Sequence, residues 1–74
     1  MQNVSEVSIN IDSGEYFKAT GSHPNGFGVW RFSIPVHGIF EFDGKYTAAR
    51  KAVYALASKI EYHLNTMKID VLPT

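Results

Sequence analysis

The sequence predicts one small α+β domain, in which an antiparallel β-sheet carries a single amphipathic helix on one face. Short segments alternate apolar and polar residues with a period of two, which is typical of strands with one buried face. One later stretch repeats its apolar residues at the helical period. The chain has 74 residues, which suits one domain and is too short for two. We therefore expect the element order β-β-β-β-α-β in a single domain over residues 1–74.

The first two strands are expected to form a hairpin. Residues 6–11 alternate strictly between polar and apolar side chains, which predicts a half-buried strand. The tripeptide 12–14 ends in glycine and is a good three-residue hairpin loop. Residues 15–20 are then predicted as the second strand. Pairing Ile11 with Glu15 turns the apolar residues of both strands to the same face.

The next two strands are expected to form a second hairpin. Residues 21–28 contain a proline, an asparagine and three glycines, so they predict a loop. Residues 29–34 and 40–43 alternate again. Pairing Ile34 with Phe40 places their large apolar side chains on one face of the sheet.

The remaining elements are a helix and a final strand. Residues 48–64 have helical periodicity, with Thr47 as the expected N-cap and Asn65 as the residue that ends the helix. The apolar stripe of this helix consists of Ala49, Val53, Leu56, Ile60 and Leu64. Residues 67–72 alternate once more and predict a short strand. An open sheet covered by the helix is the simplest architecture, and a small, partly closed barrel is the alternative.

Composition restricts the function. Seven basic and seven acidic residues give a formal net charge of zero, whereas nucleic-acid-binding domains usually carry a basic excess. The same neutrality leaves homodimerisation open. There is no cysteine, which excludes disulfides and thiolate metal sites and fits a reducing compartment. No apolar run approaches the ~20 residues that span a bilayer, and no signal segment is visible, so a cytoplasmic protein without a membrane partner is expected.

No catalytic or metal-binding pattern is apparent. His23, His37 and His63 are widely spaced in the sequence and have no cysteine to complete a zinc site. Glu41 and Asp43 are a close pair of carboxylates, but the alternation of their strand places them on the solvent face. We therefore expect no enzyme activity, no metal and no cofactor.

A binding surface is the more informative prediction. The outer face of the helix combines tyrosines with charged and polar residues, where packing alone would favour lysine and glutamate. Tyr and Arg are the residue types that most often anchor protein interfaces. The candidate partner-binding residues are Arg50, Tyr54, Ser58 and Tyr62 on the helix, with Phe27 in the glycine-rich loop. The alternatives are that the tyrosines lie flat over their own helix and that Phe27 folds back onto the core.

In size and layout the chain resembles small phage-encoded inhibitors of host RNA polymerase. The resemblance consists of Met1-Gln2-Asn3-Val4, Asp12, Tyr16-Phe17-Lys18-Ala19-Thr20, Ile34-Pro35, an alanine-rich helix and a closing strand that ends in Pro73. It implies a non-enzymatic protein that occludes a surface of a host macromolecular machine. RNA polymerase, a CRISPR complex and another defence complex are the implied partners, and host cytoplasm is the implied location.

A second, partial resemblance is to plant ethylene-response-type DNA-binding domains. It rests on Val29-Trp30-Arg31-Phe32-Ser33-Ile34, Phe40-Glu41-Phe42-Asp43-Gly44, Tyr46, and a helix containing Ala48, Ala49, Ala52 and Tyr54. That family contacts DNA from the strands of its sheet, and by position the resemblance assigns this role to Trp30 and Arg31. The alternative function is therefore a small nucleic-acid-binding domain that uses the sheet face around Arg31, together with Lys18.

Overall fold

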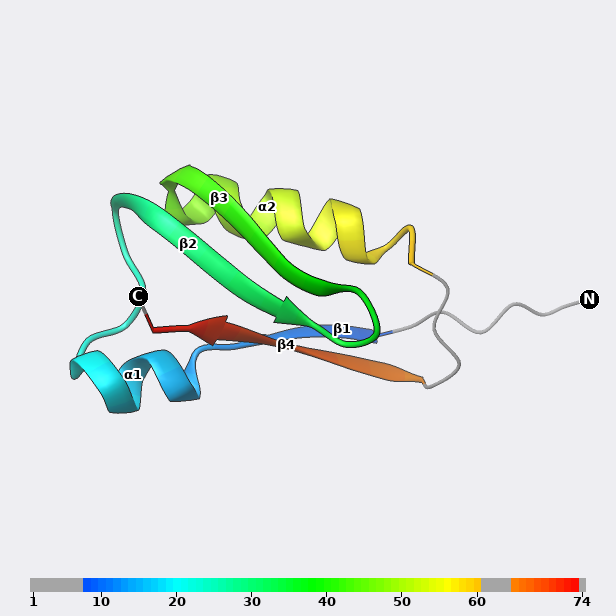
Figure 1. Cartoon of the computed structure of the whole chain (residues 1–74), viewed down its shortest axis with the longest axis horizontal. Helices are drawn as coiled ribbons and strands as arrows, with labels where there is room; N and C mark the ends of the chain where they lie inside the picture. Colours follow the sequence, from blue (N-terminus) through cyan, green and yellow to red (C-terminus); the bar gives the residue numbers. More distant parts are fainter. Residues whose placement is uncertain (1–7, 61–64, 74) are drawn as a thin grey trace, which may run out of the picture.

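The computed structural model describes residues 8–60 and 65–73, which form a four-stranded sheet and two helices (Figure 1). In chain order the elements are β1 (Ser8–Asp12), α1 (Gly14–Thr20), β2 (Phe27–Ile34), β3 (Gly38–Lys45), α2 (Tyr46–Ala57) and β4 (Thr66–Leu72). The strand order in the sheet is β1-β4-β2-β3. The predicted α+β class is confirmed, whereas the element order and the all-antiparallel sheet are wrong.

The predicted second strand, residues 15–20, is the helix α1. The Asp12 carboxylate accepts a hydrogen bond from the Gly14 backbone N–H at 2.7 Å, which turns the chain sharply at the end of β1. Gly21, with φ of 77°, ends the helix in the left-handed conformation and donates its N–H to the Phe17 carbonyl. This segment is too short for periodicity to separate a helix from a strand.

Because α1 replaces the expected hairpin, β1 finds a different partner. It pairs in parallel with β4, from Ser8 opposite Thr66 to Asp12 opposite Asp70. On its other side β4 pairs antiparallel with β2, which pairs antiparallel with β3. Strands β3 and β4 therefore run parallel with β2 between them, and α2 is the crossover that connects them. The sheet is mixed and open, with β1 and β3 at its edges.

The second predicted hairpin exists, with its register shifted by two residues. Ile34 lies opposite Gly38, not Phe40, and Phe32 lies opposite Phe40. A shift of two leaves every side chain on its predicted face, because strand side chains alternate with a period of two. The shift arises from a tighter turn, which uses only residues 35–37.

The helix α2 begins and ends before its predicted limits of 48 and 64. Lys45, not Thr47, occupies the N-cap, and the Tyr46 N–H donates to the Gly26 carbonyl at 2.9 Å. At the other end the chain leaves the helix at Ser58, whose hydroxyl donates to the Ala55 carbonyl at 2.8 Å. Residues 61–64 lie outside the described residues.

One hydrophobic core lies between α2 and a single face of the sheet. Its buried members are Trp30, Phe32 and Ile34 of β2, Met67, Ile69 and Val71 of β4, and Ala49, Val53 and Ala57 of α2. Among the strands, α2 lies closest to β3 and β2. No buried side-chain nitrogen or oxygen within the described residues lacks a hydrogen-bond partner. Neither of the two described helices is long and apolar enough to cross a membrane.

Replacing Phe32 with alanine is expected to cost about 3–5 kcal/mol, because its side chain is fully buried between the central strands and α2. That is a large part of the about 5–15 kcal/mol that stabilises a typical domain. Urea unfolding followed by tryptophan fluorescence measures the change. Val29→Ala, on the open face of the same strand, is the control and should cost less than about 1 kcal/mol. Equal losses for the two variants would refute the assignment of faces.

Replacing Val36 with glycine is expected to stabilise the domain by about 1 kcal/mol. Val36 has φ of 70° at the third position of a turn in which the His37 N–H donates to the Ile34 carbonyl. A β-branched residue is strained in this left-handed region, and the Val36 side chain is 81% exposed, so it contributes little packing. Thermal unfolding of Val36→Gly and Val36→Ala tests this expectation. Alanine keeps the Cβ and should gain less; a loss of stability in the glycine variant would contradict the strain.

Candidate binding surface

Two of the predicted binding residues, Arg50 and Tyr54, share one flank of α2. Tyr46, Arg50 and Tyr54 follow one another at four-residue intervals, and this spacing places their side chains in a row. The row is rotated away from the buried stripe of α2. Tyr54 is 52% exposed, so its ring does not lie against the core. Arg50 is exposed as well.

This flank faces the edge strand β1 across a shallow groove. The groove has a volume of about 290 Å³ and is lined by Ile11 of β1 and by Arg50, Lys51, Tyr54 and Ala55 of α2. Its floor is apolar, whereas Arg50 and Lys51 bring two cationic groups to it. The structure therefore brings two predicted residues, Arg50 and Tyr54, into one concave site.

Arg50 is held in place by an aromatic ring. Its guanidinium carbon lies 5.9 Å from the centroid of the Tyr46 ring, which is within the range of a cation–π contact. Tyr46 in turn packs edge-on against Trp30 at 5.0 Å and stacks on Phe32 at 6.3 Å. Burial raises the pKa of the Tyr46 hydroxyl, and the nearby Arg50 charge partly opposes that shift. The Arg50 guanidinium thus contacts a ring that is itself packed against the core.

The predicted binding residues Ser58 and Phe27 are not among those that line the groove. Ser58 is exposed, but its hydroxyl is engaged with the backbone at the end of α2. Tyr62 lies outside the described residues. Phe27 is 77% exposed at the start of β2, so it does not fold back onto the core. It lies opposite Lys45, whose ammonium nitrogen is 5.4 Å from the centroid of the Phe27 ring.

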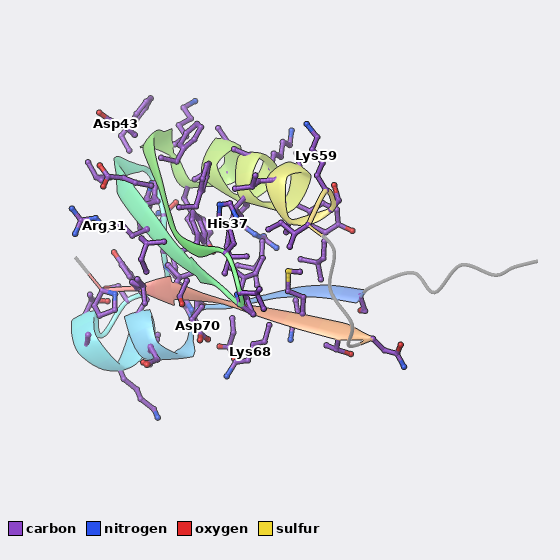
Figure 2. The ribbon with its side chains drawn as sticks, turned by 45° about the vertical axis from the view of Figure 1, so that its right-hand side comes forward. Arg31, His37, Asp43, Lys59, Lys68 and Asp70 are labelled. Carbon is purple, nitrogen blue, oxygen red and sulfur yellow. The ribbon has the colours of Figure 1, made fainter. Side chains whose placement is uncertain are left out.

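The open face of the sheet has a different charge character. By strand alternation it carries the carboxylates of Asp12, Glu41, Asp43 and Asp70 and the cations of Arg31, Lys45 and Lys68. Arg31, Lys68 and Asp70 extend away from α2 (Figure 2). Two of these cations are paired with carboxylates: Arg31 Nε lies 3.2 Å from Glu41, and Lys68 Nζ lies 3.6 Å from both Asp12 and Asp70. Carboxylates exceed cations on this face.

The two residues predicted to bind nucleic acid, Arg31 and Lys18, lie on different elements and do not form one site. Arg31 is in the centre of β2 and is paired with Glu41. Lys18 is on α1 and borders a separate shallow hollow, together with Glu15, Ala19 and Pro73. Trp30 is buried, and its indole N–H donates to backbone carbonyls, so it is not available for a base contact.

The sequence did not point to Ile11 and Lys51 as members of the site. Lys51 follows Arg50 directly and could have been recognised as part of a basic cluster in the first half of the predicted helix. Ile11 could not have been, because the predicted hairpin placed β1 beside residues 15–20 and not along the flank of α2.

Within residues 8–60 and 65–73, no three His, Cys, Asp or Glu side chains converge in a way that could hold a metal ion. In comparisons with known proteins, no family model, no curated protein and no solved structure matches this chain. The function is therefore argued from the geometry of the surface.

Acid is expected to weaken the fold partly through Asp12. The hydrogen bond from the Gly14 N–H, with a smaller contribution from Lys68, holds the pKa of Asp12 below its ordinary value of 3.8. A lowered folded-state pKa means that this stabilisation is present above the unfolded-state pKa and is lost as pH falls towards the folded-state value. Urea midpoints measured between about pH 6 and pH 2.5 should therefore fall less steeply for Asp12→Asn than for the parent chain.

The asparagine variant retains an oxygen that can accept the Gly14 N–H, so the turn before α1 is preserved. Asp43→Asn is the matched control, because Asp43 makes no ion pair within the described part of the chain. Its pH profile should follow that of the parent. An Asp12→Asn profile as steep as the parent profile would show that the lowered pKa has no effect on stability.

Proposed function

We propose that this chain is a non-enzymatic binding protein that occludes a surface of a macromolecular partner through the flank of α2, with Phe27 as an additional contact. The observation that carries the proposal is the exposure of Tyr54 beside an apolar groove to which Arg50 and Lys51 contribute charge. A domain this small would gain stability by burying such a ring. Aromatic and arginine side chains around an apolar depression are typical of the centre of a protein interface.

Occlusion requires no chemistry from the bound protein. Covering the groove would remove the Tyr54 ring and the floor around Ile11 from water, and these apolar contacts would supply most of the affinity. The ring of Tyr46 already restricts Arg50, so less side-chain entropy would be lost when a partner orders its guanidinium. A partner held in this way is blocked wherever its own ligands use the same surface.

The resemblance in size and layout to small phage-encoded inhibitors supports a specific setting. In that setting the chain acts in the cytoplasm of a bacterial host, and its partner is a large complex such as RNA polymerase or a CRISPR or other defence complex. The zero net charge and the absence of cysteine are compatible with such a protein.

Nucleic-acid binding by the sheet face is the less supported alternative. Phosphate contacts need unpaired cations, whereas Arg31 and Lys68 are both paired with carboxylates on a face where carboxylates are in excess. A phosphate backbone approaching this face would be repelled.

Affinity capture from a bacterial lysate tests the proposal. Tyr54→Ala and Arg50→Ala should each lower the recovery of a stoichiometric partner at least tenfold, because they remove the aromatic anchor and its neighbouring charge. Arg31→Ala is the matched control, since it removes the same charge from the opposite face. Recovery should fall much less between low and physiological salt than binding to nucleic acid would, because only the few charges around the groove contribute.

Two results would contradict this function. One is a shift of duplex DNA by the purified protein at physiological salt that Arg31→Ala abolishes and Tyr54→Ala does not. The other is a captured partner whose recovery none of the α2 variants affects.

A further inference from the structure

The strand β1 has one edge that pairs with no other strand among the described residues. Its inner edge is bonded to β4, and the Ser8 N–H donates to the Asn65 carbonyl at 2.8 Å. Successive peptide groups of a strand point to opposite edges, so Ser8, Asn10 and Asp12 direct their N–H and C=O groups towards β4. The N–H and C=O groups of Ile9 and Ile11 therefore point to the free edge. These groups are a template for one more strand.

The groove lies directly beside this free edge. Ile11 contributes its side chain to the groove, and Arg50, Lys51, Tyr54 and Ala55 line it from α2. A strand added to β1 would run about 4.8 Å away from it. Every second side chain of that strand would point to the α2 side of the sheet, where the groove is. An extended peptide could therefore bond to the backbone of β1 and place an apolar side chain in the groove at the same time.

The charges around the groove select the chemistry of that peptide. Arg50 and Lys51 line it, and the sequence from Gly44 to Ile60 contains no aspartate or glutamate. Lys59, which follows the C-terminal end of α2, projects away from the sheet (Figure 2). On the opposite face of the sheet, β1 carries the carboxylate of Asp12. A carboxylate is thus attracted on the α2 side of an added strand and repelled on the other side.

We propose that the free edge of β1 and the flank of α2 form a docking site for an extended acidic segment of a partner protein. The segment pairs with β1 as a fifth strand, inserts one apolar side chain between Ile11 and Tyr54, and directs a carboxylate to Arg50 and Lys51. This inference rests on the proposed function and names the chemistry of its partner.

Two other occupants are less compatible with these charges. A second copy of the chain pairing through its own β1 would bring the cationic flanks of two α2 helices towards each other. A nucleic acid would find two cations at an apolar groove, whereas tight phosphate binding needs many more contacts. An acidic peptide matches both the cations and the free backbone groups.

Selection from a random 12-residue peptide library displayed on phage particles tests the proposal. Enriched sequences should contain an apolar residue with Asp or Glu two positions away, because alternate residues of a strand share a face. A synthetic peptide of the enriched sequence should lose at least about tenfold in affinity for Arg50→Glu and for Lys51→Glu. The matched control Arg31→Glu should bind as the parent chain does.

Amide hydrogen exchange on the complex tests the pairing with β1 itself. The amides of Ile9 and Ile11 should exchange at least tenfold more slowly when the peptide is bound, while those of Asn10 and Asp12 should change little. Peptides N-methylated at alternate positions add a second measurement. Methylation of the peptide nitrogens that face β1 should abolish binding. Methylation of the alternate nitrogens, which face away from β1, should not.

Failure of the library to yield a binder would overturn the proposal, as would enriched peptides without acidic residues. Concentration-dependent dimerisation that protects Ile9 and Ile11 would identify a second copy as the occupant, and protection of these amides by single-stranded DNA would identify a nucleic acid. A partner whose capture depends on Tyr54, but which leaves the Ile9 and Ile11 amides unprotected, would overturn the pairing with β1 and leave the proposed function intact.

Discussion

The architecture depends on the hydrogen bonds of one buried indole. The Trp30 N–H is shared between the Gly44 carbonyl at 3.0 Å and the Gly26 carbonyl at 3.3 Å, and the Gly26 carbonyl also accepts the Tyr46 N–H. One side chain thus joins the loop before β2, the end of β3 and the first residue of α2. The rings of Tyr16 and Tyr46 pack on the same indole at 5.7 and 5.0 Å, so α1 is joined to this cluster as well. Gly44 is suited to its position, since a Cβ there would lie 2.9 Å from the Phe42 ring.

The position of the groove follows from this junction. Because Tyr46 is fixed at the start of α2, the helix leaves the sheet in a defined direction, and its flank faces Ile11 of β1 across the groove. The zero net charge of the chain hides an uneven distribution. Cations without carboxylates occupy α2, and the excess of carboxylates occupies the opposite face of the sheet. A chain that is neutral in total can therefore select its partners by charge.

The alternation of apolar and polar residues predicted those features of the fold that depend on one segment alone. The alternation in residues 29–34 and 67–72 correctly predicted that Trp30, Phe32 and Ile69 are buried, because strand periodicity alone decides which face a residue occupies. It could not identify α1, whose seven residues fit either periodicity, nor the parallel partner of β1, which is distant in the sequence. For the same reason Arg50 and Tyr54 of α2 could be predicted as part of the site, whereas Ile11 of β1 could not.

The pairing of β1 with β4 has a consequence for folding. Residues 8 and 66 must meet before this ladder can form, whereas the β2–β3 hairpin closes over a three-residue turn. Contacts between distant residues carry a larger loop-closure entropy and form late. During synthesis on the ribosome, β1 is made before the other strands and cannot pair until β4, the last strand, is available. Once they leave the ribosome, Ile9 and Ile11 stay exposed until β4 is also released, and interception by a chaperone or by another nascent chain is the hazard built into this topology.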